Sequence, residues 1–180
     1  MTGEASDTVP PTAGPLTLRE PVIDDGHRIH ALVRATGALD LNSTYCYLLL
    51  SSHFAGTCAV AARNGDVLGA VLGYCKPQQP ETLFIWQVGV HPSARGQGIG
   101  RRLLHYVLDQ PGCGDVRFLE ATVTPDNDAS WALFSAVARD RGAALTHGPG
   151  FDPAHFGGQS HEPEALLRIG PLAATATTRE

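Results

Sequence analysis

The sequence lacks an excess of basic residues and has no long apolar run. Its 180 residues carry a formal net charge of −5, and Lys76 is the only lysine. Proteins that bind nucleic acid through its phosphates need a basic surface, so this balance disfavours that class. No apolar run approaches the ~20 residues of a membrane span, and residues 1–15 hold few large apolar side chains, which disfavours a signal peptide or anchor.

Cysteines are also few, and none is spaced for a metal site or a disulfide framework. His27 and His30 could share a helix face, but without further ligands such a pair is more often a solvated face. We therefore expect free thiols, no metal, and a cytoplasmic protein that binds neither membrane nor nucleic acid. The four cysteines are Cys46, Cys58, Cys75 and Cys113.

What the sequence does contain is an alternation of strand and helix patterns. Polar residues that can cap helices precede the helical patterns, and the Asn64-Gly65-Asp66 turn predicts a hairpin. The expected caps are Asp24 or Asp25, Ser43 or Thr44, and Asp126 or Asn127. The expected elements are a strand at 16–21, helices at 24–39 and 43–54, strands at 57–63, 67–74 and 81–90, a helix from 99 to Pro111, a strand at 116–124, a helix ending near Gly142, and a closing strand.

This order predicts an α/β fold with a mixed sheet, in one domain over residues 16–172. Residues 1–15 and 173–180 are rich in small and polar residues, and we expect them to form flexible tails.

Three glycines crowd the start of the helix expected from residue 99, in the stretch RGQGIG at 95–100. Glycine is costly to order, but bare backbone lets a phosphate approach the unpaired N–H groups at a helix start. A P-loop is excluded because Arg101 and Arg102 follow Gly100 in place of Lys and Ser or Thr. The G-x-G-x-G spacing also differs from a dinucleotide fingerprint. The plain alternative is a helix cap without a ligand.

The R-x-x-G-x-G pattern at 95–100, together with the strand WQVGVHP before it and Asn127 after it, resembles the coenzyme A loop of the GCN5-related N-acetyltransferase (GNAT) superfamily. The resemblance spans roughly residues 16–172. It implies the GNAT fold, in which a mixed central sheet with splayed strands is flanked by helices. It also implies acetyl-CoA as co-substrate and no metal.

The resemblance assigns roles to the loop and its surroundings. Loop N–H groups would hold the pyrophosphate, and the loop arginines would add charge. Backbone groups of Val88 and Val90 would hold the pantetheine arm, with the Val88 N–H polarising the thioester carbonyl. The expected cofactor-binding residues are Val88, Val90, Arg95, Gly96, Gln97, Gly98, Ile99, Gly100, Arg101, Asn127 and Phe134.

Phe134 marks a departure from the family pattern. Many members carry a Tyr at the matching place to protonate the leaving thiolate, and Phe cannot donate a proton. Either another group or water protonates the thiolate, or it leaves as the anion, which a thiol pKa of about 8.5 permits.

Three further stretches carry side chains that core packing alone does not require. Polar residues stand just before the helix at 43–54, and a charged pair lies near residue 161. Strand alternation places Trp86 on the same face as Val88. Each also has a plain interpretation, as a helix cap, a core Trp or a surface charge. The expected substrate-binding residues are Asp40, Asn42, Ser43, Thr44, Trp86 and Glu162, and the expected catalytic residues are Val88, His161 and Glu162.

The stretches LDLNSTYCYLLL, TLFIWQVGVHP, LEATVTP and HEPEALLRIGPL resemble one GNAT subfamily, the L-2,4-diaminobutyrate acetyltransferases of ectoine synthesis. That resemblance implies acetyl transfer from acetyl-CoA to the γ-amine, which gives N4-acetyl-L-2,4-diaminobutyrate for synthesis of the compatible solute ectoine. It also implies a homodimer. The alternatives are an acetyltransferase for another small amine and a non-catalytic acyl-CoA-binding sensor.

The acceptor chemistry sets a further requirement. An alkyl ammonium has a pKa of about 10, so freeing the amine near pH 7 costs about 4 kcal/mol, which a base, a water chain or desolvation must supply. The α-amine is less basic, so selectivity for the γ-amine must come from position. We expect Asp40 and Glu162 to hold the two amines, with Glu162 or His161 relaying the γ proton. Which acid meets which amine stays open.

Overall fold

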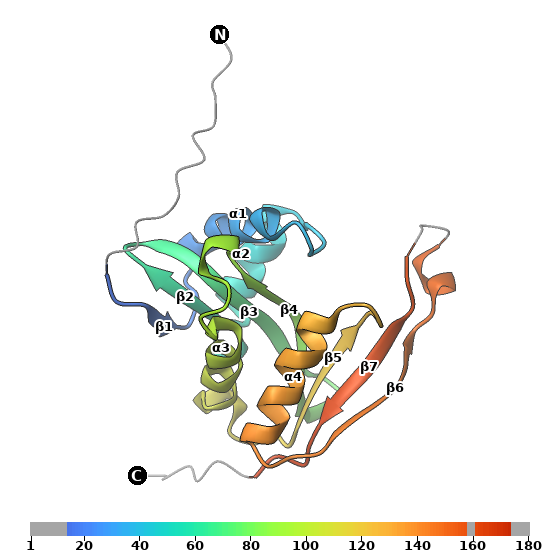
Figure 1. The fold of residues 1–180 in the computed structure, drawn as a ribbon. Coiled ribbons are helices and arrows are strands. Elements are labelled where there is room, and N and C mark those ends of the chain that lie inside the picture. Colours follow the sequence, from blue (N-terminus) through green and yellow to red (C-terminus); the bar gives the residue numbers. More distant parts are fainter. Residues whose placement is uncertain (1–13, 158–160, 174–180) are drawn as a thin grey trace.

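A seven-stranded sheet with helices on both faces forms the protein (Figure 1). The structure is a computed structural model that describes residues 14–157 and 161–173. The strands are β1 Thr17–Arg19, β2 Ala59–Arg63, β3 Asp66–Lys76, β4 Gln79–Val90, β5 Phe118–Val123, β6 Leu145–Phe151 and β7 Glu164–Ile169. The main helices are α1 Gly26–Thr36, α2 Thr44–His53, α3 Ile99–Leu108 and α4 Asp128–Asp140.

The strand order is β1-β2-β3-β4-β5-β7-β6. Strand β4 pairs with β5 in parallel, and the other neighbours in the described sheet are antiparallel. The predicted α/β fold with a mixed sheet is therefore confirmed. The tails predicted at 1–15 and 173–180 lie outside the described residues, apart from residues 14, 15 and 173.

Two apolar clusters hold the layers together. Helices α1 and α2 pack on one face of the sheet, where fully buried Ile29 and Tyr47 contact residues of β2 and β3. Helices α3 and α4 pack on the other face through side chains that include Leu103, Leu104 and Val137. Burying each such side chain contributes ~1.5–3 kcal/mol, so both helical layers are anchored on the sheet.

The predicted caps hold at two helices and fail at one. Ser43 accepts a hydrogen bond from the backbone of Cys46 at the start of α2, and Asn127 accepts one from Ser130 at the start of α4. Neither candidate aspartate caps α1 with its side chain. Instead Asp25 is buried in an ion pair with Arg19 of β1.

The chain closes with two strands where one was expected. Strand β6 has the sequence LTHGPGF and lies at the sheet edge, so its side chains are mostly exposed. Gly and Pro are tolerated at such an edge but weaken the strand pattern in the sequence. With the turn Pro153–Phe156, strands β6 and β7 form an arm that projects from the body (Figure 1). Among the described residues, no helix has the length and apolarity to cross a membrane.

Asp25 fastens the first strand to the first helix. Its carboxylate accepts hydrogen bonds from both terminal nitrogens of Arg19, at 2.5 and 2.9 Å, and from the Val22 backbone at 2.8 Å. Burial alone would raise the pKa of Asp25, but the bonds from Arg19 and Val22 outweigh it, so the pKa lies below its usual value. The ionised carboxylate is therefore the form that the fold stabilises.

We predict that Asp25→Ala lowers the free energy of unfolding by about 2–3 kcal/mol near pH 7. The substitution leaves the partly buried guanidinium of Arg19 without its carboxylate partner. Because folding lowers the pKa, this contribution is present above about pH 4 and disappears as the pH falls further. Urea unfolding at pH 7 and pH 3.5 measures both effects. The exposed neighbour Asp24 provides the control Asp24→Ala, expected within about 0.5 kcal/mol of the parent. Equal losses for the two variants would contradict the assignment.

Candidate active site

The sheet opens between its two central strands. Strand β4 pairs with β5 only from Thr82 to Ile85, although β4 continues to Val90. Past Ala121, the partner of Ile85, strand β5 pairs only with β7. The opening is lined by Trp86, Val88 and Thr122 among other residues. This is the splay that the sequence resemblance implied.

A bulge in β4 lies at the mouth of this opening. Leu72 of β3 pairs with Gln87 and the next residue, Gly73, pairs with Ile85, so Trp86 is an extra residue. The bulge breaks the alternation that predicted Trp86 on the face of Val88. Trp86 instead lines a cavity beside Gln87, while Val88 packs against the cluster under α3 and α4.

The register also decides where the backbone of β4 points. The His91 N–H donates to the Leu68 carbonyl at 2.8 Å, which makes that pair hydrogen-bonded. Hydrogen-bonded and non-hydrogen-bonded pairs alternate along antiparallel strands. Val88 and Val90 therefore belong to non-bonded pairs with β3 and turn their N–H groups toward the opening. This arrangement is compatible with their predicted role toward pantetheine.

The glycine loop presents bare backbone before α3. Gly96 and Gly98 have φ values of +76° and +69°, which L side chains rarely adopt, and a Cβ on either would meet no atom within 4 Å. Gly100 differs, because its Cβ would contact Leu133 and Val88. The first two glycines thus keep open space at a helix N-terminus, which fits an anion such as pyrophosphate. Gln97 is exposed and Ile99 is buried.

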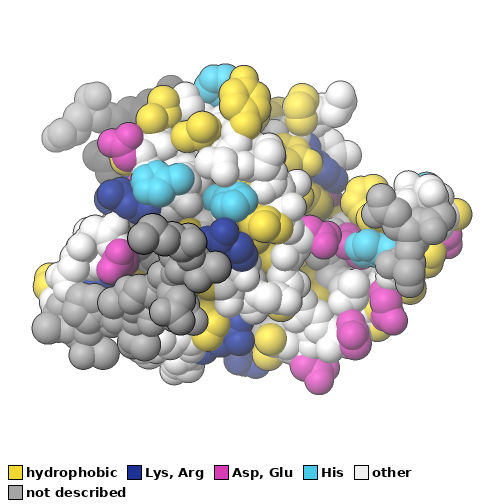
Figure 2. Space-filling view, turned by 90° about the horizontal axis from the view of Figure 1, so that it is seen from above, with side chains coloured by type: hydrophobic (Ala, Val, Ile, Leu, Met, Phe, Trp, Pro, Cys, Tyr) yellow, Lys and Arg dark blue, Asp and Glu magenta, His cyan; other side chains and the backbone are white. Residues whose placement is uncertain are grey.

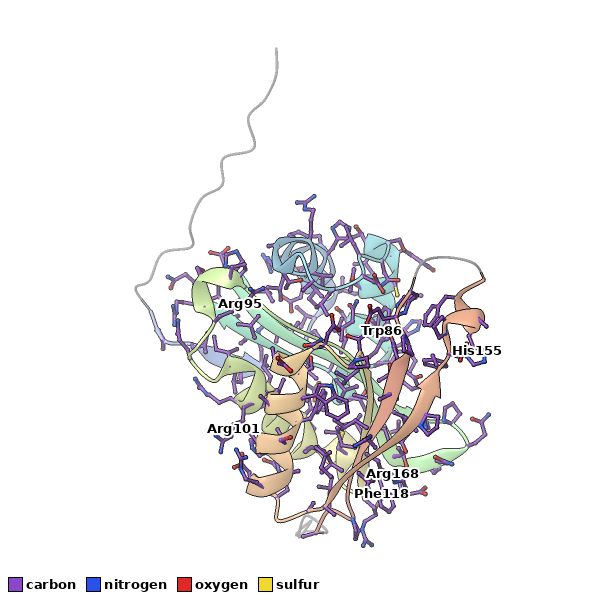
Figure 3. The ribbon with its side chains drawn as sticks, turned by 45° about the vertical axis from the view of Figure 1, so that its right-hand side comes forward. Trp86, Arg95, Arg101, Phe118, His155 and Arg168 are labelled. Atoms are coloured by element: carbon purple, nitrogen blue, oxygen red, sulfur yellow. The ribbon has the colours of Figure 1, made fainter. Side chains whose placement is uncertain are left out.

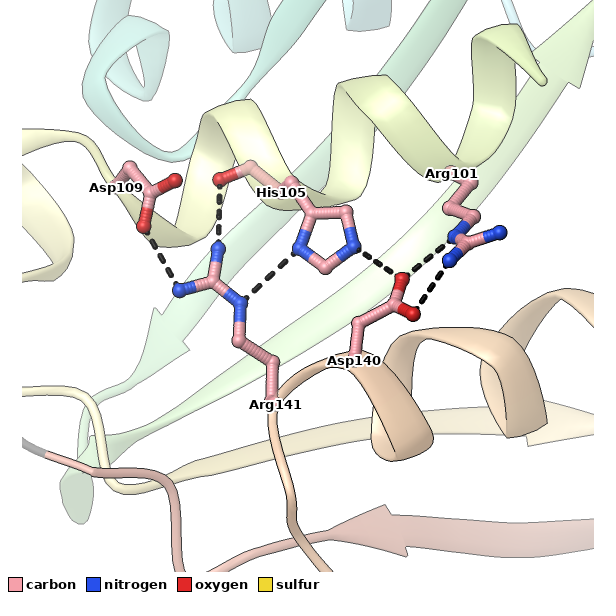
Figure 4. Close-up of polar contacts among 5 residues, drawn as sticks. All are labelled: Arg101, His105, Asp109, Asp140 and Arg141. Carbon is pink, nitrogen blue, oxygen red and sulfur yellow. Dashed lines mark hydrogen bonds and ion pairs between the residues drawn. The ribbon is translucent and has the colours of Figure 1, made fainter.

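The two loop arginines have partners within the protein. Arg95 donates to the carbonyls of Thr36 and Val90, which fastens the loop to α1 and β4. Arg101 forms an ion pair with Asp140 of α4 (Figure 4). In the same cluster, His105 contacts Asp140 at 2.7 Å. Bonds from Arg101 and then from His105 lower the pKa of Asp140 to about 2. The pair engages Nε and one terminal nitrogen of Arg101, and its predicted contribution to pyrophosphate binding stays a prediction.

Phe134 and Asn127 lie on or next to α4. Phe134 is 3% exposed and lines the opening beside Val88, as does Ser130, which sequence reasoning missed. Asn127 is the α4 cap, so its side-chain oxygen is occupied by the Ser130 N–H. Ser130 offers a hydroxyl in the opening at one turn from the apolar Phe134.

A cavity of about 620 Å³ lies on the other side of the opening, between the sheet and the arm. Viewed from above, acidic side chains and a histidine gather where the arm meets the body (Figure 2). Trp86 lies beside the arm on this side of the sheet (Figure 3). The lining residues are Asp40, Tyr74, Lys76, Phe84, Trp86, Gln87, Thr122, Pro149, Gly150, Phe151, Phe156, His161, Glu164 and Leu166.

Asp40 reaches this cavity from the loop between α1 and α2. The side-chain amide of buried Gln87 donates to the Asp40 carbonyl at 2.8 Å, and the Tyr47 hydroxyl donates to Gln87 at 3.3 Å. Sequence reasoning missed both supporting residues. Their signal was only a polar Gln in an apolar strand and a Tyr on the apolar side of α2.

The other polar residues expected beside Asp40 do not line the cavity. The side-chain amide of Asn42 donates to the Asp40 carbonyl, and its backbone N–H donates to the Tyr47 hydroxyl. Ser43 is the α2 cap, and Thr44 is an exposed residue of the first turn. Their plain interpretation, fixing the loop and starting the helix, is the one that the geometry supports.

At the far wall, Glu164 occupies the place expected for Glu162. Glu162 is exposed and outside the lining, because the cavity faces Glu164 at the first position of β7. His161 does line the cavity. Its Nδ1 lies 2.6 Å from the Glu162 carbonyl and its ring stacks on Phe156 at 3.7 Å. A carbonyl only accepts, so Nδ1 carries a proton, and the other ring nitrogen, Nε2, lies 3.7 Å from a carboxylate oxygen of Glu164.

The described residues hold no group of three or more His, Cys, Asp or Glu side chains that could bind a metal. The described cysteines all carry free thiols. The candidate site thus has two parts along β4, namely the opening toward β5 and the polar cavity beneath the arm.

Comparison with known proteins agrees with this geometry. The model of the acetyltransferase (GNAT) family matches residues 29–137. An L-2,4-diaminobutyric acid acetyltransferase of Chromohalobacter salexigens is 50% identical over 87% of this chain and 82% of its own. A relative of the same name from Nocardia farcinica is 44% identical over 94% of this chain and 88% of its own.

Among solved structures, the chain is similar to the diaminobutyrate acetyltransferase EctA from Paenibacillus lautus, in complex with its substrate L-2,4-diaminobutyric acid and coenzyme A. The TM-score is 0.85 at 42% identity, over 88% of this chain and 96% of that one.

The open space at Gly98 predicts that a negative side chain there weakens coenzyme A binding. Gly98→Asp should lower the affinity roughly tenfold or more, because a carboxylate would face the phosphates at close range. Gly98→Asn is the matched control, since Asn has a similar shape, tolerates φ > 0 and is neutral. Gly100→Asp is unsuitable, because its side chain would enter the packing of Leu133. Calorimetry with coenzyme A gives the measurement, and parental affinity in folded Gly98→Asp would contradict the phosphate assignment.

Proposed function

Since this chain belongs to the acetyltransferase (GNAT) family, we propose that it transfers the acetyl group of acetyl-CoA to the γ-amine of L-2,4-diaminobutyrate. The product would be N4-acetyl-L-2,4-diaminobutyrate, the acetylated intermediate of ectoine synthesis. The observation that carries this proposal is the acidic cavity that meets the open side of β4 at Trp86. High identity to diaminobutyrate acetyltransferases over most of their length supports it.

Acetyl-CoA supplies the activated acetyl group, and the chain supplies its position. The N–H groups of the glycine loop and of the first turn of α3 would bind the pyrophosphate. The N–H groups of Val88 and Val90 would bind along the pantetheine arm, and the Val88 N–H would stabilise the negative charge that develops on the carbonyl oxygen. Apolar Phe134 would exclude water from this end of the opening.

The cavity suits a diamine because two carboxylates face it from different elements. Asp40 comes from the loop before α2 and Glu164 from β7. A charge-assisted bond to the α-ammonium would keep that amine protonated and unreactive. The second acid would hold the γ-amine near the acetyl group. Trp86 forms the wall between them and the opening.

His161 is the proposed base for the γ-amine. His161 lines the cavity, and the bond from Nδ1 to the Glu162 carbonyl selects the neutral tautomer in which Nε2 can accept a proton. Stacking on Phe156 fixes the ring plane. Nε2 would accept the proton of the γ-ammonium, and Glu164 at 3.7 Å would stabilise the resulting imidazolium, which would offset part of the ~4 kcal/mol cost of freeing the amine near pH 7.

The proposed activity is tested by following acetyl-CoA consumption with and without L-2,4-diaminobutyrate, and by NMR of the product. We expect turnover that depends on diaminobutyrate and gives the γ-acetyl product. Turnover with polyamines but not diaminobutyrate would indicate another amine acetyltransferase. Binding of acetyl-CoA without turnover of any amine would indicate a sensor.

We predict that Asp40→Asn and Glu164→Gln each lower kcat/KM for diaminobutyrate roughly ten- to a hundredfold, because each removes a charge-assisted bond. Coenzyme A affinity should stay near the parental value. The variant that frees the α-amine should also release product acetylated at the α position. Glu162→Gln, at the exposed neighbouring acid, is the matched control and should keep the parental rate. A loss in Glu162→Gln equal to that in Glu164→Gln would contradict the placement.

We predict that His161→Asn lowers kcat about a hundredfold at pH 7, within the range of general base catalysis. The Asn amide keeps a donor toward the Glu162 carbonyl but removes the basic Nε2. The rate of the variant should climb about tenfold per pH unit up to the amine pKa, because free amine then forms without the base. Steady-state rates between pH 6 and pH 10 measure this dependence. An unchanged pH profile would exclude His161 as the base.

We further propose that residues 16–172 form the acetyltransferase domain and that two copies associate as a homodimer in the cytoplasm. Free thiols at all described cysteines support a reducing compartment. The projecting arm and the resemblance to the subfamily support association. Light scattering coupled to size-exclusion chromatography measures the mass, and a monomer at micromolar concentration would exclude the dimer.

A further inference from the structure

Lys76 is the only lysine of the chain, and it lines the cavity between the sheet and the arm, which we call the acceptor cavity. It lies at the end of β3, and its ammonium pairs with the carboxylate of Glu120 on β5. The two acids assigned to the amines lie elsewhere in the same cavity. None of the roles assigned so far uses this cation.

The cluster around Lys76 carries an excess of positive charge. Glu120 is only 2% exposed and pairs with two cations, Lys76 and Arg168. Arg168 also stacks on the Phe118 ring at 3.7 Å, and Arg168 is outside the cavity lining. Two cations on one carboxylate leave a net charge of about +1. The member of the cluster that both carries positive charge and lines the cavity is Lys76.

The positive and negative groups occupy different ends of the cavity. Phe84 of β4, Glu120 of β5 and Arg168 of β7 lie in one row across the sheet. Glu164 is four residues from Arg168 along β7, ~13 Å away along the strand. Arg168 and Phe118 lie at the end of the arm away from His155 (Figure 3). Asp40 is fixed at the level of Gln87, on the Glu164 side.

We propose that the ammonium of Lys76 recognises the α-carboxylate of the acceptor, so that this enzyme selects a diamino acid over a plain diamine. The inference rests on the proposed function and adds the group that decides the substrate class. A carboxylate would share Lys76 with Glu120, whose second cation, Arg168, stays in place. The two acids of the cavity would then bind the two ammonium groups, so the acceptor would be bound in one orientation.

The test compares L-2,4-diaminobutyrate with 1,3-diaminopropane, which has the same two amines and no carboxylate. For the parent protein, kcat/KM should favour diaminobutyrate. Lys76→Met keeps much of the apolar stem and removes the charge, and it should lower kcat/KM for diaminobutyrate roughly ten- to a hundredfold. Its kcat/KM for 1,3-diaminopropane should not fall, because that substrate has no carboxylate for Lys76 to hold and is relieved of repulsion by a like charge. Lys76→Arg should restore most of the preference.

Arg168→Met removes the other ion pair of Glu120 at a residue outside the cavity lining, so it leaves Lys76 as the one cation paired with Glu120. It should weaken the preference for diaminobutyrate less than Lys76→Met does, because the lysine remains in the cavity but its charge is then balanced by Glu120. Calorimetry with coenzyme A checks that each variant is folded.

The proposal is overturned if Lys76→Met lowers both substrates equally, or if Arg168→Met shifts the ratio as much as Lys76→Met does. A parent protein that acetylates 1,3-diaminopropane as well as diaminobutyrate would overturn it too. A parent protein inactive on both substrates would instead contradict the proposed function itself.

Discussion

The parting of β4 from β5 beyond Ile85 is the constraint on which the site depends. A strand that leaves its neighbour exposes backbone N–H groups that need partners, and such groups are costly to bury unpaired. Here the register turns Val88 and Val90 toward the opening, so a substrate with carbonyl and amide groups can complete the strand. The bulge at Trp86 lets one strand serve both sides. The N–H groups of its two valines face the opening, while the side chains of Trp86 and Gln87 line the acceptor cavity.

In the proposed acetyl-CoA site, anion binding would depend on backbone N–H groups more than on side-chain charge. The arginines next to the glycine loop are engaged within the protein, Arg95 on two carbonyls and Arg101 on Asp140. Such bonds hold the loop against α1 and α3 against α4, so the N–H groups at the helix start are fixed before an anion arrives. Preorganised donors bind without the entropic cost of ordering a loop.

In the acceptor cavity, supporting residues fix the groups that would touch the substrate. Gln87 and Tyr47 hold the backbone at Asp40, and the Glu162 carbonyl selects the tautomer of His161. These supporting groups, two neutral side chains and a backbone carbonyl, carry no net charge. Groups placed in this way keep their positions when water is expelled, which is when charge interactions become strong enough to select one amine.

The sequence by itself determined the order of elements, the glycine loop and the family, because these follow from local periodicity, turn chemistry and contiguous motifs. It also pointed to Asp40, Trp86 and His161, which the structure places in the lining of one cavity. Only the tertiary structure decided that Glu164, rather than Glu162, meets the cavity, and that a lone lysine lies at its other end. Those outcomes depend on register, on a one-residue bulge and on a weak edge strand that closes the wall. Each is set by pairing between strands far apart in the chain, which local sequence patterns do not encode.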